Sequence, residues 1–245
     1  MIITILGCWG GFPRPDGATS GYLFEQDNYK ILVECGSAVV SKLLSRIKIQ
    51  QLNAVLLSHY HNDHFCDVGV LQYARLVNSQ IGVRMGCLPI YAPTNDKKTF
   101  ELLTMLPYTQ AMPFRVGAKL KIGPFSINFY KCIHPLECYA MRITAGNHSV
   151  FYTADTAYSE SLAREATGCD LMLAESSLYP DHSGKAVGHM TSVQAAKLAE
   201  NANVGELILT HLPAYGNFQM MVDSAQKAYS GIITLAEEGL TRRLI

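Results

Sequence analysis

The sequence predicts one α/β (α+β) domain over residues 1–245, in which two mixed β-sheets pack face to face with helices on their outer faces. Three observations support this architecture. Hydrophobic residues make up 49% of the 245 residues and charged residues only 16%, so the chain can bury a sizeable core. No Pro- or Ser-rich linker divides it. Both halves show strands followed by strand–helix units, which suits layered sheets with outer helices.

The first third alternates short β-forming runs with turns. Residues 10–20 are rich in Gly, Pro, Asp and Ser and predict a loop. The polar residues 26–29 lie between two apolar runs, which is a hairpin pattern. Helical spacing of apolar residues predicts helices over 37–47 and 65–77. We expect strands in this part over residues 2–6, 22–25, 31–35 and 54–57.

The pattern resumes near residue 90, whereas residues 78–120 are the least diagnostic and are compatible with a substrate pocket or a subunit contact. The turn AGNHS at 145–149 predicts a hairpin. Thr191 and Gln194 have the spacing of a capping box at the start of a helix that runs through Ala202. Further helices are expected over 95–106 and 218–229, and strands over 90–92, 125–130, 139–144, 150–153, 171–174, 207–210 and 232–235.

Charge and cysteine content exclude several classes of protein. Twenty basic residues balance twenty acidic ones, so the chain lacks the net charge expected of a dedicated nucleic-acid or membrane-surface binder. The chain has seven cysteines, an odd number, and no two of them show CxxC spacing. This argues against a disulfide framework and against a thiolate zinc site. The N-terminus lacks a basic signal-peptide region, and no apolar stretch approaches about 20 residues. A cytoplasmic protein with no membrane partner is expected.

The chemistry is concentrated in SHYHNDHF, residues 58–65, which directly follow the predicted strand 54–57. Imidazole nitrogens and carboxylate oxygens are good ligands for divalent metals such as zinc. At positions i and i+2 of an extended segment, His59 and His61 project to one side. Asp63 and His64 follow where the chain turns into a helix, so they can point to a second place nearby. The flanking apolar strand and helix disfavour a solvated cluster or a tag.

Further candidate ligands follow other predicted strands: His134, Asp155 and His211. Loops at strand ends are where a rigid scaffold usually places chemistry. Each residue alone is a weak signal, because a lone His near a strand end is more often structural. Together with the 58–65 segment they supply the seven ligands of a dinuclear site. His148, in the hairpin turn, and His182, in the loop 179–188, are not expected to serve the site.

These motifs resemble the metallo-β-lactamase superfamily, and within it the ribonuclease Z-like branch. The resemblance implies an αββα four-layer sandwich with two divalent metal ions at one edge of the two sheets, zinc being preferred and manganese the alternative. Relatives are often homodimers, so a second copy is an expected partner. The residues that carry the resemblance are TSGYLF with ILVECGS (19–37), SHYHNDH (58–64), HPLECYAMRI (134–143), FYTADT (151–156) and AESS, GHMTSVQAAKLA and LTHL (within 174–212).

The resemblance also implies a role for each candidate residue. His59, His61 and His134 would hold one metal ion; Asp63, His64 and His211 would hold the other; Asp155 would bridge both. Asp63 is also a catalytic candidate. Glu175 and His189 match a Glu and a His that, in this branch, contact the scissile phosphate region and pass a proton to the leaving oxygen, a general-acid role. Their alternative interpretation is a loop carboxylate and a residue before an N-cap.

The sequence departs from the branch in places. Residues 174–177 are Ala-Glu-Ser-Ser where the branch often has His-Glu-Ala-Thr, and Glu34 stands where the superfamily often has Asp. No basic, Gly- and Pro-rich insertion resembles the arm with which ribonuclease Z proteins clamp tRNA. These departures leave the expected metal centre intact and leave the substrate open between an RNA 3′ end and a small nucleotide.

The expected function is a metal-dependent hydrolase, a phosphodiesterase resembling the tRNA 3′-processing endoribonuclease ribonuclease Z. The resemblance implies that a water activated by a dinuclear metal centre attacks phosphorus. His189, just before a capped helix, favours a phosphate, because a helix N-terminus attracts anions. Two alternatives stay open: a thioesterase or lactonase of the glyoxalase II-like type, and a metal-stabilised binding or sensing protein with little turnover.

Overall fold

The computed structural model describes residues 1–182 and 187–245. Its first sheet has seven strands and is mixed, because the first strands along the chain pair antiparallel and the later ones parallel. In spatial order these strands are β14 (Thr241–Arg243), β1 (Ile2–Gly7), β2 (Gly21–Gln26), β3 (Tyr29–Val33), β4 (Ala54–Leu56), β5 (Leu88–Ala92) and β6 (Thr109–Pro113).

The second sheet repeats this plan with the second half of the chain. It also has seven strands, antiparallel from β7 to β10 and parallel from β10 to β13. In spatial order they are β13 (Ile232–Leu235), β12 (Glu206–Thr210), β11 (Leu171–Glu175), β10 (His148–Tyr152), β9 (Tyr139–Ala145), β8 (Phe125–Lys131) and β7 (Leu120–Ile122). The predicted fold class of two mixed sheets is confirmed.

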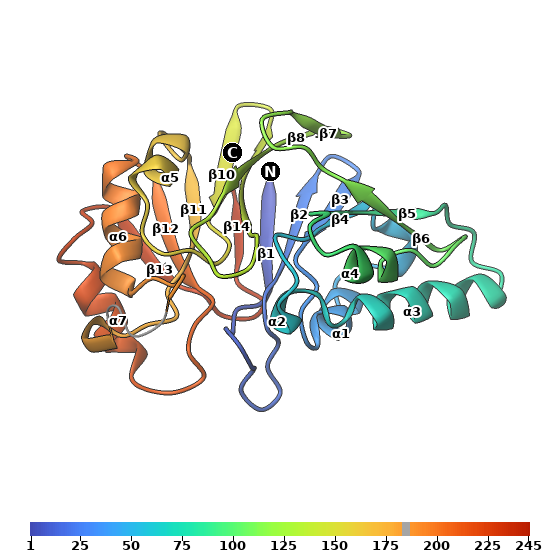
Figure 1. Cartoon of the computed structure of the whole chain (residues 1–245), viewed down its shortest axis with the longest axis horizontal. Coiled ribbons are helices and arrows are strands. Elements are labelled where there is room, and N and C mark those ends of the chain that lie inside the picture. The colour runs from blue at the N-terminus through green and yellow to red at the C-terminus, as the bar shows by residue number, and fades with distance from the viewer. Residues whose placement is uncertain (183–186) are drawn as a thin grey trace.

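The helices lie outside the two sheets, as Figure 1 shows. One group lies beside the first sheet: α1 (Val39–Leu44), α2 (Asn62–Phe65), α3 (Val68–Gln80) and α4 (Lys97–Leu102). The other lies beside the second sheet: α5 (Glu160–Glu165), α6 (Ser192–Asn201) and α7 (Phe218–Ala225). Two short 3₁₀ helices complete the described elements: η1 (Ile49–Gln51) and η2 (Pro180–His182).

Alternation along the strands explains why two separate cores form. In β3, Ile31 and Val33 belong to the core between the sheets, whereas Leu32 belongs to the core beneath the outer helices. Successive side chains of a strand point to opposite faces, so a strand covered on both sides is apolar throughout. The core between the sheets is rich in aromatic rings, among them Tyr22, Phe24, Phe125, Phe129 and Tyr152.

Several local predictions are confirmed. The Thr191 Oγ1 atom accepts a hydrogen bond from Gln194 N at 3.2 Å, and Gln194 Oε1 accepts one from Thr191 N at 2.9 Å. This capping box starts α6, as its sequence spacing predicts. The turn after β9 reverses the chain into β10, with Gly146 in the left-handed region at φ 59°.

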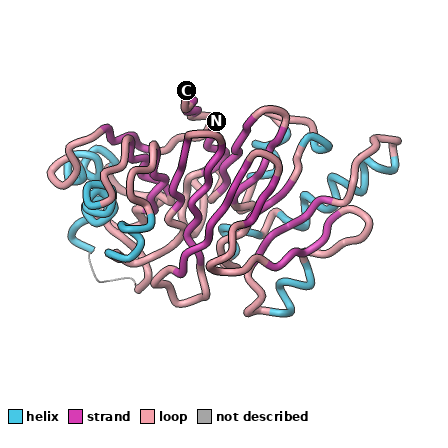
Figure 2. The backbone as a smooth tube through the Cα atoms, turned by 90° about the horizontal axis from the view of Figure 1, so that it is seen from above, coloured by secondary structure: helices cyan, strands magenta, loops and turns pink. Residues whose placement is uncertain are grey.

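Other elements differ from the sequence predictions. The helix expected over 65–77 is α3, which runs from Val68 to Gln80, and a separate short helix, α2, precedes it. The helix expected over 95–106 ends at Leu102, and the strands β6, β7 and β14 and the helix α5 were not predicted. The strand β14 is short and polar and forms by pairing with β1, as in Ile2 with Arg243, which also brings the termini together (Figure 2).

Strand direction brings distant parts of the chain to one edge of the molecule. The strands β3 and β4 are parallel, as are β10, β11 and β12, so their carboxyl ends share an edge within each sheet. The strand β8 runs in the direction of β10, because both are antiparallel to β9. Every predicted ligand segment follows one of these strands. Within the described ranges, the helices are too short or too polar to cross a membrane.

Candidate metal centre

Three histidines form the first cluster of candidate ligands. The Nε2 atom of His59 lies 3.0 Å from Nδ1 of His61, and Nε2 of His134 lies 3.1 Å from the same atom. His134 Nδ1 donates to the carbonyl oxygen of Gly188 at 3.0 Å. Because that oxygen can only accept, His134 carries a proton on Nδ1 and its Nε2 faces the cluster. The expected grouping of His59, His61 and His134 is present in the structure.

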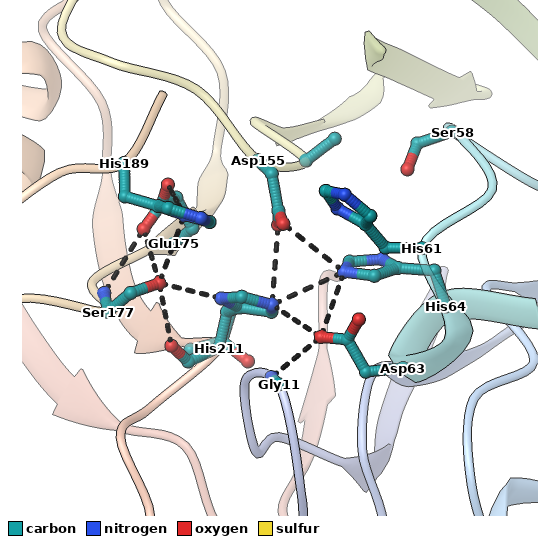
Figure 3. Close-up of polar contacts among 12 residues, drawn as sticks. Gly11, Ser58, His61, Asp63, His64, Asp155, Glu175, Ser177, His189 and His211 are labelled. Carbon is teal, nitrogen blue, oxygen red and sulfur yellow. Dashed lines mark hydrogen bonds and ion pairs between the residues drawn. The ribbon is translucent and has the colours of Figure 1, made fainter. Parts of the chain in front are cut away.

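The second cluster consists of Asp63, His64 and His211. His211 Nε2 lies 3.0 Å from Asp63 Oδ2 and 3.2 Å from His64 Nε2. The backbone N–H of Gly11 donates to the same Asp63 oxygen at 2.7 Å (Figure 3). The short helix α2 positions Asp63 and His64, since it turns the chain toward the edge before α3 begins. The expected second grouping is therefore present as well.

Asp155 lies between the two clusters. Its Oδ2 atom is 3.7 Å from His59 Nε2 and 3.4 Å from His64 Nε2, and its Oδ1 atom is 3.4 Å from His211 Nε2. Asp155 is 1% exposed, and its Oδ1 atom makes no hydrogen bond to any described residue. A buried carboxylate oxygen without a hydrogen bond is costly unless a cation or another group satisfies it. The mixed nitrogen and oxygen donor set and this oxygen fit a pair of divalent cations.

The first cluster is made of neutral imidazoles. Burial is the largest cause that lowers the pKa of His59 well below its ordinary value, and the neighbouring His64 adds to it. Burial, followed by repulsion from His134, also lowers the pKa of His61. Burial dominates the lowered pKa of His134. These nitrogens can bind a cation without first losing a proton.

The second cluster is made of ion pairs. Burial opposes charge on His64, but the Asp155 and Asp63 carboxylates outweigh it and hold the pKa of His64 well above its ordinary value. The pKa of His211 is raised against burial by the same two carboxylates. The pKa of Asp63 is lowered because hydrogen bonds from His211 and His64 outweigh burial. A cation that binds here must displace protons from the imidazoles.

Glu34 supports the 58–64 segment from the end of the neighbouring strand β3. Its buried carboxylate accepts from Ser58 N at 3.1 Å, and its Oε2 atom lies 3.7 Å from His64 Nδ1. Its backbone is left-handed, with φ 63°. Such conformations in non-glycine residues cost roughly 1–3 kcal/mol and cluster at functional sites. The sequence signal for this role is an acidic residue within an apolar run, although the sequence alone indicates only a departure from the superfamily pattern.

Glu175 and His189 form a pair at the other side of His211. His189 Nδ1 lies 2.9 Å from Glu175 Oε1, and the two imidazole rings of His189 and His211 are stacked with centroids 5.7 Å apart (Figure 3). Burial opposes charge on His189, but the hydrogen bond and charge of Glu175 raise its pKa to about 9. The ring is therefore protonated at neutral pH and lies beside the clusters.

Sequence analysis missed other residues of the site. Ser177 contacts both Glu175 and His211. Gly10 lies against the His211 ring so closely that a Cβ atom there would be 2.6 Å from Nδ1. The signal was available in the glycine-rich start of the loop 10–20, which favours close backbone approach.

Residues expected to lie outside the site do so. His148 contacts Asp170 at 3.9 Å, and His182 contacts Asp181 at 3.7 Å. In the loop 179–188, residues 183–186 lie outside the described residues. All seven cysteines, each in a described segment, are free.

Comparisons with known proteins give a matching family model and a similar protein of known structure. The beta-lactamase superfamily domain model matches residues 29–212. The probable metallo-hydrolase YhfI of Bacillus subtilis is 44% identical over 239 residues, which cover 98% of each chain. The crystal structure of YhfI matches the chain with a TM-score of 0.97 over 98% of both chains.

More distant structures share the fold. The short form of human tRNase Z has a TM-score of 0.77 at 18% identity, over 99% of each chain. A diphosphatase from the PhnP family has a TM-score of 0.78 at 15% identity, over 100% of this chain and 98% of the other. Identities this low establish a common architecture alone.

Proposed function

The chain belongs to the beta-lactamase superfamily, and from that premise we propose that it is a metal-dependent hydrolase of phosphodiester bonds. The observation that carries the proposal is the Glu175–His189 pair beside the candidate metal ligands. Cleavage of a phosphodiester expels an alkoxide, which is a poor leaving group unless a proton is delivered to it. A protonated imidazole beside the clusters provides that proton.

The candidate ligands would hold two divalent cations, with zinc as the preferred metal and manganese as the alternative. His59, His61 and His134 would hold the first, Asp63, His64 and His211 would hold the second, and Asp155 would serve both. Bound cations of this kind lower the pKa of water and neutralise charge on phosphoryl oxygens. YhfI, the similar protein from Bacillus subtilis, is itself described as a probable metallo-hydrolase, which supports this proposal.

Other groups of the chain orient the candidate ligands and deliver the proton. Gly11 N orients the Asp63 carboxylate at 2.7 Å. His189 uses Nδ1 for Glu175, so its Nε2–H is free to donate to the leaving oxygen. Glu175 keeps His189 protonated and fixes its ring. In this scheme Asp63 and Asp155 hold the reacting groups in place, and His189 acts as the general acid.

A thioester is less well matched to this arrangement. The thiol that leaves has an ordinary pKa of about 8.5, so its thiolate departs without a general acid. Among phosphodiesters, we favour a small substrate over an RNA 3′ end. The sequence has no evident clamping insertion, and its twenty basic residues are balanced by twenty acidic ones. A polyanionic RNA gains its affinity chiefly from basic side chains on its phosphates.

The deciding experiment is hydrolysis of bis-p-nitrophenyl phosphate by zinc- or manganese-loaded protein, with metal content measured in the same sample. A p-nitrophenyl thioester is assayed in parallel, and His148→Ala, which lies outside the site, serves as the matched histidine control. We expect phosphodiester hydrolysis with about two metal ions per chain. If the protein binds two metal ions but hydrolyses only the thioester, the thioesterase alternative replaces the proposal. If it binds two metal ions and hydrolyses neither substrate, the binding or sensing alternative replaces it. Failure to bind metal would refute the proposed metal site.

A further inference from the structure

The hydroxyl of Ser177 lies between a candidate metal ligand and the carboxylate that holds the proposed general acid. Its Oγ atom is 2.7 Å from His211 Nδ1 and donates to Glu175 Oε2 at 2.8 Å (Figure 3). Ser177 follows β11, whereas His211 follows β12, and the two strands are parallel neighbours. The pairing of these strands places the hydroxyl beside the ring.

The direction of each hydrogen bond follows from the partners. His211 directs Nε2 toward Asp63 and His64, so Nδ1 faces Ser177. A serine hydroxyl has one proton and two lone pairs, and a carboxylate oxygen only accepts. Two acceptors lie within reach of this proton, and Glu175 Oε2 at 2.8 Å is nearer than the carbonyl oxygen of His211 at 3.3 Å. The Ser177 proton therefore points to Glu175, and its oxygen accepts the N–H of His211 Nδ1. This arrangement leaves the Nε2 of His211 to face the second cluster.

The Glu175 carboxylate is saturated by these contacts. Its Oε1 atom accepts from Thr156 N at 3.1 Å and pairs with His189 Nδ1 at 2.9 Å. Its Oε2 atom accepts from Ser177 N at 3.1 Å and from Ser177 Oγ at 2.8 Å. A continuous chain of hydrogen bonds thus runs from His211 through Ser177 and Glu175 to His189.

Little room remains for another group to replace the hydroxyl. The His211 ring is 4% exposed, and a Cβ atom on Gly10 would come within 2.6 Å of Nδ1. Ser177 is therefore the residue that supplies the hydrogen-bond partner of this nitrogen. Loss of the hydroxyl would leave a buried N–H without its partner, which is unfavourable, or would let the ring rotate away.

We propose that Ser177 is a positioning residue that holds His211 with Nδ1 protonated and Nε2 directed at the second metal cluster, and that holds Glu175 against His189. One hydroxyl then orients the metal ligand His211 and, through Glu175, the general acid His189. The inference rests on the proposed function for the identity of the second cluster as a metal site. Groups that orient a metal-ligating histidine through its other nitrogen commonly change metal affinity by about 10- to 100-fold.

The test compares Ser177→Ala with Ser177→Thr, which keeps the hydroxyl. The matched control is Ser176→Ala, because Ser176 is also buried and donates only to the carbonyl oxygen of Thr210 at 3.2 Å. Three quantities are measured for each variant: the tautomer of His211 by ¹⁵N NMR of the zinc-loaded protein, the affinity for zinc by competition with a chelator, and phosphodiester hydrolysis at saturating zinc.

We expect Ser177→Ala to lose the Nδ1–H signature of His211 and to bind one of two zinc ions about 10- to 100-fold more weakly, with slower hydrolysis even at saturating zinc. Ser177→Thr should restore all three, and Ser176→Ala should match the native protein. A native tautomer and zinc affinity in Ser177→Ala, or no restoration in a folded Ser177→Thr variant, would overturn the inference. The tautomer and affinity need no substrate, so a native protein without phosphodiesterase activity would refute the proposed function separately.

Discussion

The Nδ1 atom of His189 lies 2.9 Å from Oε1 of Glu175, and this contact joins the second sheet to the loop before α6. Glu175 is fully buried, whereas the His189 side chain keeps 21% of its surface exposed. The pair therefore has a fixed inner member and an outer member that substrate can reach. The pair lies beside His211 but is not among the seven candidate ligands, so its substitution tests catalysis separately from metal binding.

Replacement of His189 by Ala should lower turnover and leave the metal content nearly unchanged. General acids of this kind contribute about 10²- to 10⁴-fold to the rate. The measurement is kcat with a dinucleoside monophosphate, whose leaving group is an alkoxide, together with metal analysis of the same protein; kcat with bis-p-nitrophenyl phosphate, whose p-nitrophenolate leaves without a proton, should change much less. A loss of bound metal in His189→Ala would instead make this residue a ligand, since it lies within reach of Asp155 and His211.

The Glu175–His189 pair should also make the stability of the metal-free protein depend on pH. The pKa of His189 is raised from 6.5 to about 9 on folding, so the pair stabilises the folded state fully below about pH 6.5. That contribution, at most about 3 kcal/mol, is lost as the pH rises through about 9. Urea unfolding of the native protein and of His189→Gln, which donates without titrating, measures it.

The difference in unfolding free energy between these two proteins should shrink from pH 6 to pH 10. Other titrating groups are common to both and cancel in the comparison. A difference that stays constant over this interval would mean that the pair does not hold a proton in the folded state.

Removal of the carboxylate between the clusters should affect both metal ions. Asp155 contacts His59 and His64 of different clusters, whereas Asp63 contacts members of the second cluster alone. We expect Asp155→Ala to lose most of both metal ions and Asp63→Ala to lose about one, and both to lose activity. Metal analysis after gel filtration distinguishes them. Asp181→Ala, an exposed control on η2, should keep both ions.

Replacement of Glu34 by Ala should destabilise the fold and the metal site together. It leaves the buried Ser58 N–H without its acceptor, which costs about 1–3 kcal/mol. Glu34→Gln keeps an acceptor oxygen and should cost less. Urea unfolding of metal-free protein gives both values, and equal stability of the native and Ala proteins would show that water replaces the carboxylate.

A methyl group at Gly10 should displace His211. Its Cβ would lie 2.6 Å from the imidazole Nδ1 atom, so Gly10→Ala should destabilise the chain by roughly 1–3 kcal/mol and weaken zinc binding. Gly69→Ala is the matched control, because that glycine lies in α3 with open space around it. Zinc affinity by chelator competition should fall for the first variant only, and equal affinities would contradict the packing argument.

The candidate ligands were predictable because their signal is local. A His or Asp that directly follows an apolar β-forming run lies at the end of a strand, whatever the rest of the chain does. The segment 58–64 carries two pairs of donors, and the helix α2 separates them as the change from extended to helical spacing predicts. The capping box of Thr191 and the hairpin at 145–149 are short-range features as well.

The sequence by itself thus determined the two-sheet architecture and the seven candidate ligands, through periodicity and strand-end chemistry. The tertiary structure alone decided which donors meet, where α2 ends and α3 begins, and that β14 closes the first sheet beside β1. It also decided the parts played by Glu34, Gly10 and Ser177. Their contacts join residues 24 to 201 positions apart in the chain, or depend on the parallel pairing of β11 with β12. Such contacts have no local pattern, because strand pairing and packing create them.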